Sequence, residues 1–216
     1  METKWLSAVQ LLRFSLKTAI RRSRRAGVGF HTESKKTATD QPEYTGLMAT
    51  AIKLIEPTQS EYLAELERKT NRKNSFFRMM AHKPEVLKNF VPLYGSIMGP
   101  GAVERRIKEL VYLAASFANE CAYCTAAHIT SAKKAGVSEE EINALQTEQN
   151  QFFSGPERAA ILYSRELTRE VAANETADEL FEQFNDEQIV EITLIISMAN
   201  FTNRFNNGLG LKPEEE

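Results

Sequence analysis

The segment Glu109-Leu-Val-Tyr-Leu-Ala-Ala-Ser-Phe-Ala-Asn-Glu-Cys121-Ala-Tyr-Cys124-Thr-Ala-Ala-His128 carries both a helical pattern and the candidate chemistry of this chain. Its apolar residues recur at helical spacing before the first cysteine, which predicts one helix there. Asn119 is a favourable capping residue, so we expect a second helix over about residues 120–135. Spacings of three and four residues place both cysteines and the histidine along one face of that second helix.

The two cysteines have the placement of a reactive dithiol. They lie near the start of the predicted helix, where unsatisfied backbone N–H groups favour a thiolate. Residues three apart on a helix approach to roughly 5–6 Å, which is within the reach of a disulfide. A thiolate attacks a peroxide, and a neighbouring thiol then condenses with the resulting sulfenic acid. The spacing therefore predicts a nucleophile, a resolving thiol and, in His128, a base.

Other interpretations of these residues stay open. Glu109 shares a mostly apolar helix line with Tyr112 and Leu113, which favours a buried carboxylate that orients His128 or passes a proton, against an ordinary surface charge. The cysteines are alternatively two small core side chains. Zinc bound by Glu109, both cysteines and His128 is a third interpretation. Structural zinc sites usually draw on two separated ligand pairs, so we expect no metal.

The rest of the main body also reads as helical. Pro84 opens a segment that runs to about Ile97, and no alternating apolar runs are joined by a hairpin signal. Residues 189–198 are rich in β-branched side chains, but the length of the pattern favours a buried helix. Four Ser/Thr-x-x-Glu patterns are typical of helix starts: Thr58…Glu61, Ser138…Glu141, Ser154…Glu157 and Thr176…Glu179. The fold class predicted is all-α, a bundle of helices packed on helices.

The charge distribution divides the chain into a basic arm, residues 1–40, and a main domain, residues 41–216. The arm holds nine basic and three acidic residues, against 18 basic and 26 acidic residues in the domain. The spacing of apolar residues in the arm predicts a basic amphipathic helix, which is followed by a linker. It suits a solvated or subunit-packing helix, an organellar transit peptide, or contact with an anionic membrane. We expect a cytoplasmic protein, or one of an organelle matrix if the arm is a transit peptide.

Several function classes are disfavoured by composition. The acidic domain lacks the character of a nucleic-acid-binding surface. No stretch approaches the ~18–20 apolar residues of a membrane span. No glycine-rich phosphate loop follows a strand, so a nucleotide cofactor is not expected, and we predict no cofactor at all.

The pattern Glu-x11-Cys-x2-Cys-x3-His, met by Glu109, Cys121, Cys124 and His128, resembles the alkylhydroperoxidase D-like (AhpD-like) branch of the carboxymuconolactone decarboxylase family. The resemblance extends to Phe76–Glu85 and to Asn200–Asn206, and it covers about residues 43–212. It implies an all-helical AhpD-like subunit that forms a homo-oligomer. The active site is then expected at the start of the helix that carries the CxxCxxxH motif.

The resemblance also implies a function, namely reduction of hydroperoxides by a thiol-dependent peroxidase with a dithiol reductant. Cys124 is similar to the family's attacking thiol, Cys121 to its disulfide partner, and His128 with Glu109 to its proton relay. The known peroxidases of the group have a second histidine where this chain has Tyr123, and a phenol with a pKa of ~10 is a poor base near neutrality. The alternatives are a decarboxylase-like enzyme that acts on a small organic acid, and a non-catalytic oligomeric scaffold.

Overall fold

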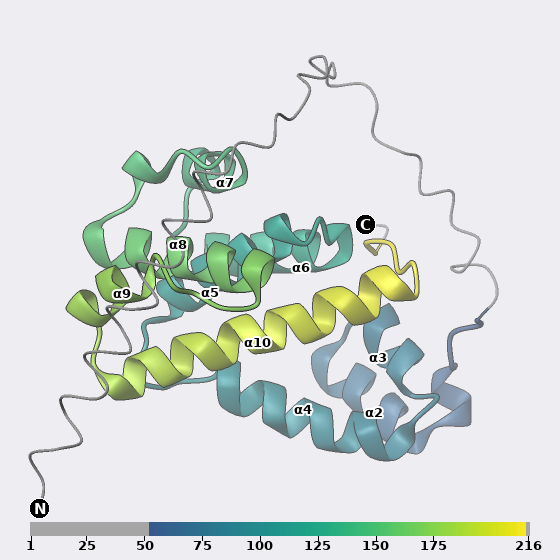
Figure 1. The fold of residues 1–216 in the computed structure, drawn as a ribbon. Helices are drawn as coiled ribbons and strands as arrows, with labels where there is room; N and C mark the ends of the chain where they lie inside the picture. The colour runs from purple at the N-terminus through teal and green to yellow at the C-terminus, as the bar shows by residue number, and fades with distance from the viewer. Residues whose placement is uncertain (1–51, 215–216) are drawn as a thin grey trace, which may run out of the picture. The chain divides into compact units, whose positions relative to one another are not determined.

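A computed structural model describes residues 52–214 of the chain (Figure 1). The basic arm and the interpretations attached to it lie outside the described residues. Within residues 52–214 the chain forms only helices and turns, so the all-α prediction is confirmed. None of the helices in this range is both long and apolar enough to cross a membrane. The elements in chain order are η1 (Pro57–Gln59), α2 (Glu61–Thr70), α3 (Ser75–Met80), α4 (Pro84–Met98), α5 (Arg105–Ala118), α6 (Ala122–Lys134), α7 (Glu139–Gln146), η2 (Asn150–Phe152), α8 (Gly155–Glu170), α9 (Ala177–Gln183) and α10 (Asp186–Gly208).

Helix α5 is the centre of the bundle. Nine consecutive residues from Lys108 to Ser116 are buried, because α6, α8 and α10 all pack against this helix. One side of α5 contributes Val111 and Tyr112 to the larger hydrophobic core. The other side contributes Leu110 and Leu113 to a second core beneath α7 and α8. Residues 110–115 are all apolar or aromatic, as expected for a stretch buried on all sides, whereas the buried Lys108 and Glu109 each have an ionic partner.

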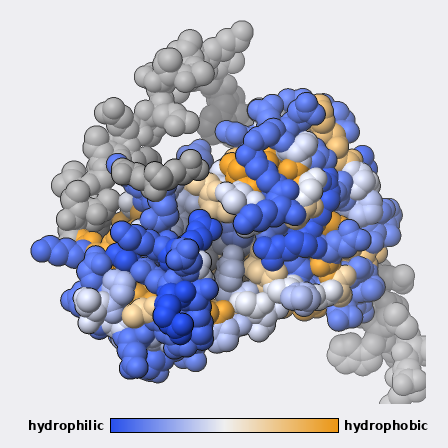
Figure 2. Space-filling model, turned by 180° about the vertical axis from the view of Figure 1, so that it is seen from behind, coloured by the Kyte–Doolittle hydropathy of each residue, from blue (hydrophilic) through white to orange (hydrophobic). Residues whose placement is uncertain are grey.

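Helix α10 confirms the helical interpretation of residues 189–198. It begins with a capping box in which Asn185 and Gln188 exchange hydrogen bonds, and it crosses beside α4 and α5 (Figure 1). Burial of one face outweighs the weak helix propensity of its β-branched residues. Its outer face leaves Val190, Leu194 and Phe201 exposed. The view in Figure 2 shows a largely hydrophilic surface on which hydrophobic patches are small and separate.

Two of the four predicted capping boxes are present, those at Ser138 and Ser154. The prediction for Thr58 was wrong, because Ser60 caps α2 by accepting a hydrogen bond from the Leu63 amide. The prediction for Thr176 was also wrong in its side-chain contact. Its hydroxyl donates to the carboxylate of Glu166, so it is not free to cap α9.

A buried ion pair fixes the loop that precedes α5. Lys108, 1% exposed, pairs with Glu191 of α10 and donates to the carbonyls of Ile97 and Gly99 at 3.2 and 2.6 Å. Gly101 sits so close that a Cβ there would lie 2.0 Å from the Glu191 carboxylate. These contacts set the position at which α5 begins, and α5 carries Glu109.

Candidate active site

The two cysteines lie at the start of α6, with their sulfur atoms 2.8 Å apart as free thiols. The cap of α6 is Cys121 itself, whose sulfur accepts a hydrogen bond from the Cys124 amide at 3.4 Å. The predicted capping role of Asn119 was therefore wrong. Asn119 ends α5 instead, and its amide donates to Asn200 and Asn203 of α10.

The two thiols have unequal acidity. The pKa of Cys124 is lowered from 9.0 to about 7, and the hydrogen bond donated by Cys121 is the largest cause, against the opposing effect of burial. The Asn206 amide, which donates to the sulfur at 3.1 Å, and the neighbouring side chains of Asn203 and Thr202 contribute to the same lowering. The pKa of Cys121 is raised, because its proton is engaged by Cys124 and because it is buried. Cys124 is therefore the thiol that ionises first.

His128 lies on the same helix face and is held from three sides. Its Nδ1 is 2.7 Å from Glu109 Oε2, and its ring stacks on Tyr112 with centroids 3.5 Å apart. Its Nε2 is 3.1 Å from the hydroxyl of Tyr94 on α4. Burial, followed by the charge of Glu109, raises the pKa of Tyr94, so that this phenol keeps its proton. The histidine therefore connects Glu109 to Tyr94 and has no hydrogen bond to either cysteine.

Glu109 is fully buried, as its helix pattern predicted. Its Oε1 forms an ion pair with Arg105 at 2.5 Å, but no donor is aligned for a hydrogen bond to that oxygen. A buried carboxylate needs a cationic partner because desolvation of an unpaired charge is costly. Arg105 supplies that cation here, and His128 Nδ1 lies within hydrogen-bond distance of the other carboxylate oxygen.

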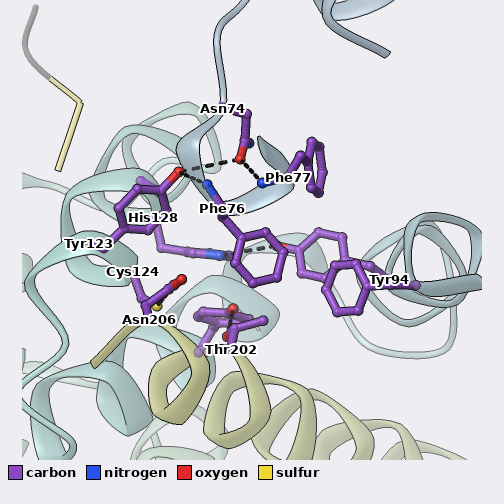
Figure 3. Close-up of a pocket in the computed structure, with 12 residues that line it drawn as sticks. Asn74, Phe76, Phe77, Tyr94, Tyr123, Cys124, His128, Thr202 and Asn206 are labelled. Carbon is purple, nitrogen blue, oxygen red and sulfur yellow. Dashed lines mark hydrogen bonds between the residues drawn. The ribbon is translucent and has the colours of Figure 1, made fainter. Parts of the chain in front are cut away.

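A cavity of about 120 Å³ opens beside the sulfur of Cys124 (Figure 3). Most of its walls are aromatic, and none of its lining residues is lysine or arginine. Cys124 reaches the cavity, whereas Cys121 lies behind it and does not. The lining residues are Asn74, Phe76, Phe77, Phe90, Tyr94, Tyr112, Tyr123, Cys124, Ala127, His128, Thr202 and Asn206.

Tyr123 points away from the histidine. Its hydroxyl accepts a hydrogen bond from the Phe76 amide at 3.2 Å, and it lies 3.1 Å from Glu214 Oε1 and 3.3 Å from Asn74 Oδ1. It thus joins α6 to the start of α3 and to the segment after α10. In the known peroxidases of the group this position is a histidine. In this chain it is Tyr123, whose hydroxyl holds α6 to the neighbouring segments.

The structure brings the four residues predicted from the sequence to one place, and it adds Tyr94, Thr202 and Asn206. The amides of α10 had a signal in the sequence, because Asn200, Asn203 and Asn206 recur at a spacing of three in the second half of this helix. Tyr94 had no such signal. Within residues 52–214 no group of three or more His, Cys, Asp or Glu side chains has the arrangement of a metal site.

The sequence of this chain is similar to a known protein family and to a curated bacterial protein. Residues 84–163 match the profile of the Carboxymuconolactone decarboxylase family. The uncharacterized protein YdfG of Bacillus subtilis (strain 168) is 32% identical over 114 residues, which span 50% of this chain and 77% of YdfG. The chain belongs to the carboxymuconolactone decarboxylase family.

Solved structures agree with this assignment. One is a protein of unknown function from Agrobacterium tumefaciens, described as a candidate antioxidant defence protein AhpD. It is 28% identical, with a TM-score of 0.57 over 63% of this chain and 96% of that one. The debrominase Bmp8 bound to 2,3,4-tribromopyrrole has a TM-score of 0.66 and 21% identity over 77% of this chain and 93% of that one. At that identity the likeness to Bmp8 shows the fold alone.

Proposed function

We propose that this chain is a thiol-dependent peroxidase of the AhpD type. The observation that supports this best is the inequality of the two thiols. Cys124 is acidified and opens onto the cavity, while Cys121 lies 2.8 Å behind it and donates a proton toward it. A nucleophile in contact with substrate and a resolving thiol in contact with the nucleophile are the two parts that dithiol peroxide reduction needs.

In the first step the Cys124 thiolate attacks the terminal oxygen of a hydroperoxide, R–O–OH. A sulfur–oxygen bond forms, the oxygen–oxygen bond breaks, and the electron pair leaves on the alkoxide RO⁻. The proton that Cys124 gives up on ionising goes to solvent, and one proton returns to the alkoxide through Tyr94. Tyr94 donates its hydroxyl proton into the cavity and is reprotonated by way of His128, which Glu109 orients. The products are the alcohol and the sulfenic acid of Cys124.

In the second step the thiol of Cys121 attacks the sulfur of the Cys124 sulfenic acid. The disulfide forms and hydroxide leaves with the thiol proton as water. The sulfur atoms are already in contact, so closing the disulfide needs little movement of the backbone. An external dithiol, a protein or a small thiol, then reduces the pair by exchange and is itself oxidised to a disulfide.

A second candidate is reductive removal of a halogen from a small aromatic ring. The aromatic walls of the cavity favour it, because Phe76, Phe90 and Tyr94 suit the face of a flat ring. Bmp8, which shares the fold, binds such a molecule. The same dithiol would supply the two electrons, and the halogen would leave as halide. A decarboxylase-like role has less support, because the cavity wall offers a carboxylate substrate no lysine or arginine.

The deciding experiment compares Cys124→Ser, Cys121→Ser and the double variant. Each is assayed for loss of tert-butyl hydroperoxide with dithiothreitol as reductant, and for halide release from a brominated pyrrole. We expect Cys124→Ser to abolish peroxide consumption, and Cys121→Ser, when no reductant is added, to allow one turnover that stops at the sulfenic acid. Peroxide treatment of the natural chain should remove two hydrogen masses from the peptide that holds both cysteines. Undiminished peroxide consumption in Cys124→Ser would refute the proposal.

A further inference from the structure

Asn206 combines two features that the mechanism above does not use. It lies near the end of α10, is 1% exposed, and its Nδ2 donates to the sulfur of Cys124 at 3.1 Å. Its Oδ1 is buried and has no hydrogen-bond partner among the described residues. An unpaired buried acceptor costs about 1–3 kcal/mol. The fold gains nothing from that oxygen, so its orientation calls for another explanation.

Cys124 determines which way the amide faces. A thiolate has lone pairs and no hydrogen, so it accepts hydrogen bonds and requires the NH₂ group on its own side. The carbonyl oxygen is thereby turned from the sulfur. Asn206 lines the same cavity as Cys124, and Figure 3 shows its amide oxygen standing clear of the sulfur. Asn206 therefore contributes a hydrogen-bond acceptor without a partner among the described residues to the wall of the cavity that the sulfur reaches.

We propose that Asn206 is a catalytic residue, whose Nδ2 holds the Cys124 sulfur and whose Oδ1 accepts the O–H of the oxygen that this sulfur attacks. The inference rests on the peroxidase function proposed above. The hydrogen of the terminal oxygen stays on that oxygen while the oxygen–oxygen bond breaks, and it becomes the hydrogen of the sulfenic acid. The hydrogen bond to Oδ1 therefore persists from encounter to product and keeps the oxygen in line with the sulfur.

The proposal specifies a substrate class. A hydroperoxide, organic or hydrogen peroxide itself, carries a hydrogen on the attacked oxygen and satisfies Oδ1. Electrophiles without such a hydrogen leave Oδ1 unpaired, and a site built around a hydrogen bond rejects the analogue that lacks it. The cavity of about 120 Å³ fits a small hydroperoxide group better than a bulky one.

The test separates the two roles of the amide by means of two probes and two variants. N-ethylmaleimide reacts with a thiolate and has no hydrogen-bond donor, whereas tert-butyl hydroperoxide has one. Both rates are measured at the same pH and compared as a ratio, so that the ionised fraction of the thiol, which enters both rates equally, cancels. Asn206→Leu removes both donor and acceptor. Asn206→Asp removes the donor to sulfur but keeps an acceptor oxygen.

We expect Asn206→Leu to lower the hydroperoxide rate about tenfold more than the maleimide rate, the value of one hydrogen bond. Asn206→Asp should keep the ratio of the two rates near that of the natural chain, while its half-maximal alkylation moves to higher pH. Asn207→Leu is the matched control, because Asn207 is exposed and donates to the Asn119 carbonyl. If the leucine variant does not fold, Asn206→Ala takes its place.

An unchanged ratio in the leucine or alanine variant would overturn the inference and reduce Asn206 to a support for the sulfur. That result leaves the peroxidase proposal standing, because the natural chain still consumes hydroperoxide. A natural chain that reacts with maleimide and not with hydroperoxide overturns both. The two failures are therefore distinguishable.

Discussion

Replacing Cys121 with alanine should make Cys124 a weaker acid. The hydrogen bond from the Cys121 thiol is the largest cause of the lowered pKa of Cys124, which is about 7 instead of 9.0. Alanine removes that donor and leaves the amides of Asn206 and Asn203 in place. The charged form of Cys124 then loses its main partner, so its pKa must rise and less thiolate is present at neutral pH.

The size of the effect follows from the ionised fraction. With a pKa of about 7, about half of Cys124 is thiolate at pH 7. A rise of one unit leaves about one tenth ionised, and a full return to 9.0 leaves about one hundredth. Alkylation at pH 7 should therefore slow by about fivefold to fiftyfold in Cys121→Ala. Above about pH 10 the variant and the natural chain should react at similar rates, because Cys124 is then largely ionised in both proteins.

The assay is the pseudo-first-order rate of alkylation by N-ethylmaleimide between about pH 5 and pH 11, with the modified residue identified by mass spectrometry. Cys121→Ser is the matched control, since its hydroxyl restores a donor to the same sulfur and should bring the midpoint part of the way back. Cys124→Ser should remove the titration altogether. Superimposed profiles for Cys121→Ala and the natural chain would refute the assigned cause of the acidity.

The remaining predictions concern the proton path, a tether and the fold. Tyr94→Phe should lower the hydroperoxide rate at saturating pH by about 10²-fold and leave the maleimide rate unchanged, since only the first reaction needs a proton donor. In the natural chain the hydroperoxide rate should rise with pH to a midpoint of about 7 and then level, following the ionisation of Cys124. Tyr123→Phe should lower the free energy of unfolding in urea by about 1–2 kcal/mol and change the hydroperoxide rate far less than Tyr94→Phe does. Glu191→Leu leaves Lys108 buried without its carboxylate and should cost about 3–5 kcal/mol in the same unfolding experiment.

The sequence predicts the parts of this fold that depend on local period. The apolar run after Asp186 is read correctly as a helix because its repeat continues too long for a strand. Caps are read correctly where the hydroxyl has no competing partner, as at Ser138. They are misread where a distant group competes, as when Glu166 engages the Thr176 hydroxyl ten residues away. Local signals identify possible helix starts, and tertiary contacts decide among them.

In the candidate site, too, the residues related by local spacing could be predicted from the sequence, and those brought together by helix packing could not. The spacing of Cys121, Cys124 and His128 on one helix is a local property, so their shared face was predictable. Tyr94 meets His128 across 34 residues of sequence, and Asn206 meets Cys124 across 82. No helical period relates such residues, because the packing of α4 and α10 against α5 and α6 creates both contacts. The catalytic roles assigned to all of these residues stay predictions until they are tested.

Tyr123, which stands where the known peroxidases of the group have a histidine, leaves the proton relay proposed above intact. The hydroxyl of Tyr123 is engaged with the Phe76 amide and Glu214, on the side of the residue away from His128. The imidazole instead meets a different phenol, Tyr94, whose raised pKa keeps the proton available for donation. The relay requires a donor that faces the leaving oxygen, and Tyr94 lines the same cavity as the Cys124 sulfur. In the mechanism proposed above, a donor supplied from α4 makes a second base next to Cys124 unnecessary, and Tyr123 tethers α6 to α3.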